Sequence, residues 1–249
     1  TEAMCKCWER VLQIGCLSIE KHGVLFAQSL PQWVTLCLNA GVLSIDASTV
    51  HHIRPKTRVF CVRLLSRAFV NPHFRRNSSL WMSKMMYMSS TEPKLEEDPH
   101  IQRAISCLED ILSLENGQCG ILVESLATKY IAISPEEKQE WEQDPEGFAR
   151  EVDMETSPDA DTPRPSGIVL LECMLEYSPD NVRKSIMSFA QSIASNPSTL
   201  DDAIIAREAV FRIVGECFPH LKHDVSFEQW YTNELRGMIQ CTDPVFNSI

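Results

Sequence analysis

Apolar residues recur every three or four positions along most of this chain, and this spacing restricts its fold more than any other feature. The pattern is clearest from Pro55 to Val70, where at about 100° per residue the apolar side chains share one arc. The members of this arc are Phe60, Cys61, Leu64, Leu65 and Ala68. No stretch alternates apolar and polar residues strongly enough between turn signals to predict a strand. We therefore expect an all-α protein.

The predicted helices come in pairs joined by short turns. The pairs are 3–21 with 24–39, closed by Gly23 and Gly41; 55–70 with a Met-rich helix over 80–88; a pair that starts at Asp98–Pro99 and is divided by Gly117; 166–177 with 180–195; and 200–219 with 226–240. About five hairpins at intervals of roughly 35 to 50 residues predict an α-solenoid. The segment 206–215 resembles a HEAT repeat in its second-position Arg, small residues and Gly.

A strongly acidic segment interrupts the hairpins. Ser134 can cap a helix that Pro135 opens, and Asp144 can cap a second turn after it. Trp141 and Phe148 are expected to anchor this segment rather than to contact a ligand. The predicted organisation is therefore three HEAT-like hairpins over 1–133, an acidic capped helix and loop insertion over 134–165, and two HEAT-like hairpins over 166–249.

The net charge of −11 is unevenly distributed. Residues 134–161 hold eleven acids against Lys138 and Arg150, whereas residues 47–91 hold no acid and eight basic residues. Three of these basic residues form a stripe beside the apolar arc of 55–70; they are Lys56, Arg63 and Arg67. An acidic chain without interleaved exposed aromatic residues is a poor nucleic-acid binder. The stripe is better explained as a contact surface for a partner protein, or as the oppositely charged partner of the acidic insertion within the molecule.

Two features of the carboxyl-terminal half predict opposite environments, one exposed to solvent and one buried. The stretch 157–165 is rich in proline and acid, which indicates a solvent-exposed loop. Arg207 falls within the apolar arc of 200–219. An arginine buried there needs an acidic partner, which we expect on a neighbouring element.

The groups that could support catalysis are scarce. Most of the ten cysteines lie in apolar helical patterns, where a free thiol behaves as a small hydrophobic group. These are Cys16, Cys37, Cys61, Cys107, Cys119, Cys173 and Cys217. The pair Cys5 and Cys7 lacks the two-residue spacer of zinc and redox motifs, and His220 with His223 is better explained as a solvated helix end. The acid clusters 96–98 and 201–202 are helix starts. We predict no enzyme, no cofactor and no metal.

The sequence also bears on localisation. No apolar run approaches the roughly 18 to 20 residues that a membrane span needs, and no basic-then-apolar leader opens the chain. We expect no membrane insertion, and a soluble, unsecreted protein. Because it begins without an initiator Met and inside an apparent helix, we also expect a piece of a longer protein.

The acidic segment is similar to a signature of the karyopherin-β (importin) family of nuclear transport receptors, most closely the importin-eleven class. The matching residues are Trp141, Glu142, Asp144, Pro145, Glu146 and Phe148, followed by an acidic loop and Arg164–Pro165 before a helix. Residues 207–211, with 227–230 and Leu235, also resemble that class. The likeness covers residues 134–240, whereas residues 1–133 agree only in being helical hairpins.

This resemblance implies a middle segment of a HEAT-repeat receptor that binds Ran in its GTP form, carries protein cargo and passes nuclear pores by contact with nucleoporins. It implies a protein of nucleus, cytoplasm and nuclear envelope. The amino-terminal repeats with which the family mainly engages Ran are not recognisable in this chain. The alternative is a HEAT scaffold of another multiprotein complex.

Overall fold

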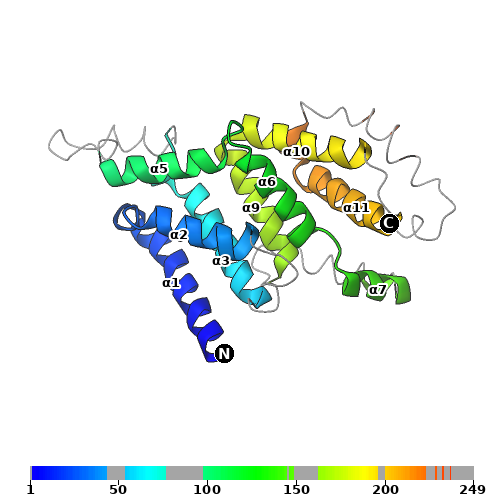
Figure 1. Cartoon of the computed structure of the whole chain (residues 1–249), viewed down its shortest axis with the longest axis horizontal. Helices are drawn as coiled ribbons and strands as arrows, with labels where there is room; N and C mark the ends of the chain where they lie inside the picture. The colour runs from blue at the N-terminus through cyan, green and yellow to red at the C-terminus, as the bar shows by residue number, and fades with distance from the viewer. Residues whose placement is uncertain are drawn as a thin grey trace.

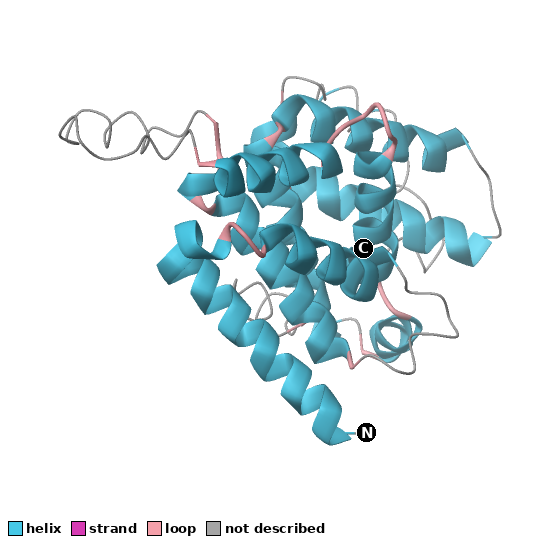
Figure 2. Cartoon of the chain, turned by 60° about the vertical axis from the view of Figure 1, so that its left-hand side comes forward, coloured by secondary structure: helices cyan, strands magenta, loops and turns pink. Residues whose placement is uncertain are grey.

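The computed structural model describes residues 2–43, 54–76, 98–144, 146–148, 162–195 and 200–222, together with Glu228, Thr232 and Arg236. Over these residues the chain is an all-α helical solenoid, and every regular element in Figure 2 is a helix. The predicted fold class is confirmed. The Met-rich segment 80–88, His223, most of 226–240 and most of the 157–165 stretch lie outside the described residues.

The helices follow the predicted order along the chain (Figure 1). In the first part they are α1 (Glu2–Phe26), α2 (Leu30–Cys37), the π-helical η1 (Leu38–Leu43), α3 (Pro55–Val70), the 3-10 turn η3 (Pro72–Phe74), α5 (Pro99–Ile111), α6 (Gln118–Leu126) and the π-helical η5 (Ala127–Ile131). In the second part they are α7 (Pro135–Gln143), α9 (Pro163–Tyr177), α10 (Pro179–Ser195), α11 (Leu200–Glu216) and α12 (Phe218–Leu221).

Helix α3 lies at the centre of the packing, and its bounds are those that the sequence predicts. It contacts α1 on one side and α9 on another, and it also packs against α2 and η1. The predicted apolar arc is buried, but Val59, Val62 and Phe69 are buried as well. The helix is therefore enclosed on nearly all sides, which a one-sided apolar pattern does not predict.

The second half of the solenoid packs through α6, η5 and α9. Helix α6 lies against α10, while η5 contacts α9 and α11. Helix α5 starts at the predicted place, and Asp98 caps it by accepting a hydrogen bond from the His100 N–H at 2.7 Å. Gly117 adopts a left-handed φ of 70° between α5 and α6, so it does separate the two helices.

The sequence prediction is correct for Gly23 and wrong for Gly41. Two helical stretches meet within Glu2–Phe26 at His22, which has a non-helical φ of −136° and ψ of 40°, so the first stretch ends beside Gly23. Gly41 does not end a helix, because η1 runs through it to Leu43. The reason is close packing. A Cβ added to Gly41 would lie 2.4 Å from the Cβ of Cys61 on α3, so only glycine allows η1 to approach α3 this closely.

Polar contacts tie the two π-helical segments to α3. The Lys129 ammonium donates to the Leu43 carbonyl at 3.1 Å, and the Tyr130 hydroxyl donates to the Gly41 carbonyl. Arg58 of α3 donates to the Lys129 carbonyl at 3.1 Å, and its guanidinium lies 5.0 Å from the centre of the Tyr130 ring. These contacts join η1, α3 and η5, which are distant in sequence.

The seven cysteines predicted as free thiols are free, and five of them are buried. Burial raises the pKa of Cys173 to about 11 and that of Cys217 to about 12. Thiolates are the reactive form of cysteine, so these side chains are inert packing groups near neutral pH.

This burial predicts a loss of stability in alkali. Unfolded thiols lose their protons near pH 8.5, whereas the folded Cys173 and Cys217 hold theirs to pH 11 or above. The folded pKa is raised, so stability is fully present below the unfolded pKa and falls as pH rises above it. We expect the free energy of unfolding in urea to drop by about 1 kcal/mol per thiol between pH 7.5 and pH 9.5. Cys173→Ala should remove the part of that drop that Cys173 contributes. If the free energy of unfolding falls with pH as steeply in the variant as in the original protein, the drop does not come from this thiol.

Candidate interaction site

The acidic helix α7 begins with a complete capping box. The Ser134 hydroxyl accepts a hydrogen bond from the Glu137 N–H at 3.1 Å, and the Glu137 carboxylate accepts one from the Ser134 N–H at 2.7 Å. The predicted second turn is also present, because the Asp144 carboxylate accepts a hydrogen bond from the Gly147 N–H at 3.0 Å. Local sequence therefore defines both ends of α7.

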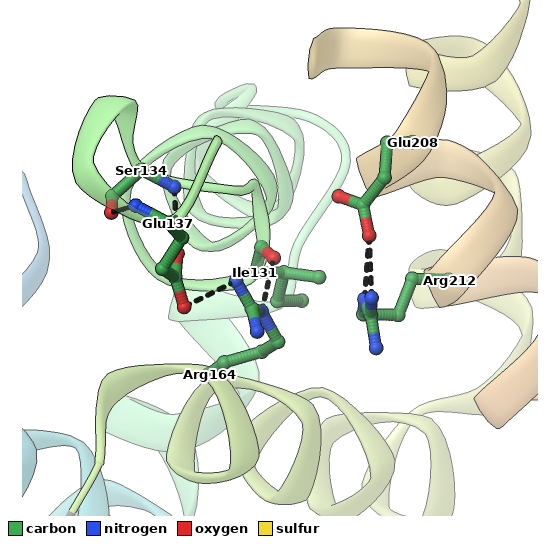
Figure 3. Close-up of polar contacts among 6 residues, drawn as sticks. All are labelled: Ile131, Ser134, Glu137, Arg164, Glu208 and Arg212. Carbon is green, nitrogen blue, oxygen red and sulfur yellow. Dashed lines mark hydrogen bonds and ion pairs between the residues drawn. The ribbon is translucent and has the colours of Figure 1, made fainter. Parts of the chain in front are cut away.

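Two features attach α7 to the solenoid. Trp141 is buried, with 7% of its surface exposed, so its predicted role as an anchor is confirmed. Phe148 is only half-buried. The second attachment is an ion pair, in which Arg164 of α9 meets the Glu137 carboxylate at 2.7 Å (Figure 3).

Arg164 is the residue on which the junction depends. It lies in the first turn of α9 and is 6% exposed, and its Nε donates to the Ile131 carbonyl at the end of η5 at 3.1 Å. One side chain thus connects η5, α7 and α9, as Figure 3 shows. A cation in the first turn opposes the helix dipole, so α9 alone does not favour arginine there. The favourable energy comes from Glu137 and the Ile131 carbonyl.

This burial corrects the prediction for the 157–165 stretch. Its carboxyl end is not a solvent-exposed loop, because α9 begins at Pro163 rather than at 166 and Arg164 is inside the fold. The start of the helix could have been predicted, because Pro163 favours the first position of a helix. The burial of Arg164 could not, because its partner Glu137 is distant in the sequence.

A second buried charge faces the junction from α11. The Glu208 carboxylate is 6% exposed and accepts hydrogen bonds from Arg212, one turn later, at 2.7 Å. Figure 3 shows this pair across from Arg164. Arg207, which the sequence pattern places in the buried arc, is exposed instead. The prediction that Arg207 is buried is therefore wrong. The buried charge next to it is Glu208, and the arginine that pairs with Glu208 lies on the same helix.

The outer surface of α7 and of the turn that follows it is acidic. Glu140, Glu142, Asp144 and Glu146 are all exposed. Lys138 lies 3.9 Å from Glu142 on the same helix, a pair of small energetic value at an exposed position. Anchoring through Trp141 and Glu137 therefore leaves four carboxylates in solvent at one place on the solenoid.

The basic stripe on α3 lies next to α1. Arg67 is 3.7 Å from Glu20 of α1, so among the described residues it forms an ion pair with the neighbouring helix. The charged groups of Lys56 and Arg63 lie 5.9 and 5.8 Å from the centre of the Phe60 ring. Whether the stripe also meets a partner protein stays a prediction.

Metal-binding groups do not gather among the described residues. Within those ranges no three His, Cys, Asp or Glu side chains come together as a set that could hold a metal ion. Cys5 is half-buried and Cys7 exposed, and both are free thiols. His220 lies in the short helix α12. None of the helices that the structure describes has the length and apolar character needed to span a membrane.

Comparison with known proteins identifies two similar chains. The sequence is 29% identical to Importin-11 of Homo sapiens and 28% identical to Importin-11 of Mus musculus, in each case over 120 residues. The matched part is 46% of this chain but only 12% of either relative. No family model matches the chain, and no solved structure matches it.

Proposed function

We propose that this chain is a segment of a nuclear transport receptor of the importin type. It is a binding solenoid without catalysis, and its parent protein binds Ran in its GTP form, protein cargo and nucleoporins. The parent moves between cytoplasm and nucleus through nuclear pores. The observation that carries this proposal is the similarity to Importin-11 of two species. Because the match spans about an eighth of each relative, every activity of the parent is part of the proposal.

The structure supports a binding role in two ways. The helical solenoid offers extended surface, which is how repeat proteins engage partners. The signature residues also have clear physical roles: Trp141 anchors α7 and Asp144 caps the turn that follows it. Together they hold an acidic face at the junction between η5 and α9.

A pull-down from the full-length parent tests this proposal. Immobilised parent is incubated with Ran loaded with a non-hydrolysable GTP analogue or with GDP. We expect the GTP form to be retained at least about tenfold more than the GDP form, which corresponds to roughly 1.4 kcal/mol of discrimination. Equal retention, or stable co-purification with an unrelated assembly and no Ran, would reject the transport role in favour of a HEAT scaffold.

A further inference from the structure

Two buried thiols meet where α2 packs against α3. Cys37 is the last residue of α2, and Cys61 lies in the middle of α3; their exposed fractions are 0% and 2%. The two helices are in contact and lie side by side in Figure 1. The Cys37 and Cys61 side chains are hydrogen-bonded to each other. The fold therefore brings two thiols that are distant in the sequence into direct contact.

The two backbones are close enough at this contact for a disulfide bond. Gly41 follows Cys37 by about one helical turn, because η1 continues α2 without a break. Residues four positions apart lie on one face of a helix, with their Cβ atoms about 5–6 Å apart. A Cβ added to Gly41 would lie 2.4 Å from the Cβ and 3.3 Å from the Sγ of Cys61. The face that carries Cys37 is therefore pressed against Cys61, as a disulfide requires.

Packing keeps Cys37 protonated while α2 and α3 are in contact. The hydrogen bond to Cys61 and burial raise the pKa of the Cys37 thiol far above its usual range. The thiolate is the form of cysteine that reacts with oxidants, and it needs access to them. Oxidation therefore begins when η1 transiently separates from α3. Closure of the contact then returns the two sulfur atoms to each other.

A third thiol nearby provides an internal comparison. Cys16 of α1 is half-buried, so oxidants reach it more easily than they reach the two buried thiols. It is close enough to Cys61 for an electrostatic interaction between the two side chains. Accessibility thus favours a link from Cys61 to Cys16, whereas direct contact favours a link from Cys61 to Cys37.

We propose that Cys37 and Cys61 are a peroxide-sensitive pair that locks α2 to α3 as a disulfide. Hydrogen peroxide oxidises one thiol to a sulfenic acid, and one water leaves. The second thiol attacks that sulfur, the S–S bond forms, and the sulfenic hydroxyl leaves with the remaining thiol proton as a second water. Two thiols and one peroxide thus give one disulfide and two waters. This inference does not depend on the proposed transport function.

Oxidation of the reduced full chain tests the pairing. The folded protein is treated with hydrogen peroxide near neutral pH, the remaining thiols are blocked with N-ethylmaleimide, and the protein is digested with trypsin. Cys16, Cys37 and Cys61 fall on separate peptides, 11–21, 22–56 and 59–63, so mass spectrometry distinguishes the links between them. We expect the link between Cys37 and Cys61 to be at least about fivefold more abundant than that between Cys16 and Cys61. A dominant link to Cys16, or no link between Cys37 and Cys61, would overturn the proposal.

Unfolding in urea provides an independent measurement of the lock. The disulfide closes the loop 37–61 and lowers the entropy of the unfolded chain, so peroxide should raise the urea midpoint by at least about 0.5 M. In Cys37→Ala the peroxide-treated and reduced proteins should have the same midpoint. Cys119→Ala is the matched control, because Cys119 is a buried thiol of α6 outside this contact, and it should keep the full rise. A rise that persists in Cys37→Ala, or a link without any rise, contradicts the lock.

Discussion

Glu137→Ala is expected to lower the free energy of unfolding by about 3–5 kcal/mol, because it removes the counter-charge of a buried guanidinium. Arg164 has 7% of its side chain exposed, whereas Glu137 has 31% exposed. The arginine therefore cannot recover its hydration without leaving the fold. Urea unfolding of the full chain, monitored by circular dichroism, measures the effect.

The double variant Glu137→Ala with Arg164→Met separates the charge from the packing. Methionine keeps apolar volume in the site and removes the buried charge, so the double variant should regain more than half of the lost stability. Glu140→Ala is the control on the same helix; its side chain is exposed and should matter by less than about 0.5 kcal/mol. If Glu137→Ala and Glu140→Ala have the same free energy of unfolding, the ion pair with Glu137 does not stabilise the buried Arg164.

Gly41→Ala is expected to cost about 3 kcal/mol, near the upper end for overpacking. The new methyl group would lie 2.4 Å from the Cβ of Cys61, and neither carbon can rotate away because both are fixed by the backbone. Segment η1 must therefore move off α3, which also separates the Gly41 carbonyl from the Tyr130 hydroxyl. Thermal unfolding followed by calorimetry reports the loss.

The matched control is Gly120→Ala in α6. A Cβ at Gly120 meets nothing within 4 Å, so this change should raise stability by up to about 1 kcal/mol through helix propensity alone. Adding Cys61→Ala to Gly41→Ala should give no rescue, since alanine retains the clashing Cβ. Recovery in that double variant would mean that the sulfur, not the backbone approach, limits the packing.

The sequence predicts those helix bounds and caps that are determined by residues close to one another in the chain. The bounds of α3, the start of α5 at Asp98 and Pro99 and the Ser134 cap of α7 all follow from residues within a few positions of one another. Each depends on helix periodicity or on a side chain that reaches a nearby backbone group. These elements were therefore predicted correctly.

The errors arise where contacts between residues distant in the sequence determine the local structure or the burial of a side chain. The sequence pattern suggests that Gly41 ends a helix, but a glycine is present there because α3 approaches the backbone too closely for a side chain. Arg164 looks solvated, but its partners are Glu137 and the end of η5, more than twenty residues away. The error at Arg207 has a different cause. Neighbouring positions on a helix differ by a rotation of about 100°, and the buried face passes through Glu208 and Ala209 rather than Arg207.

The ties among η1, α3 and η5 have a mechanical consequence. In a stack of helical pairs, the flexibility of the whole is the sum of the flexibilities of the contacts between neighbouring pairs. Arg58, Lys129 and Tyr130 make polar contacts across this joint as well as apolar ones, so sliding there requires several directional bonds to break together. Bending of the described part of the solenoid is therefore expected at the contacts on either side of η1, α3 and η5, with these three elements moving together as one stiff unit.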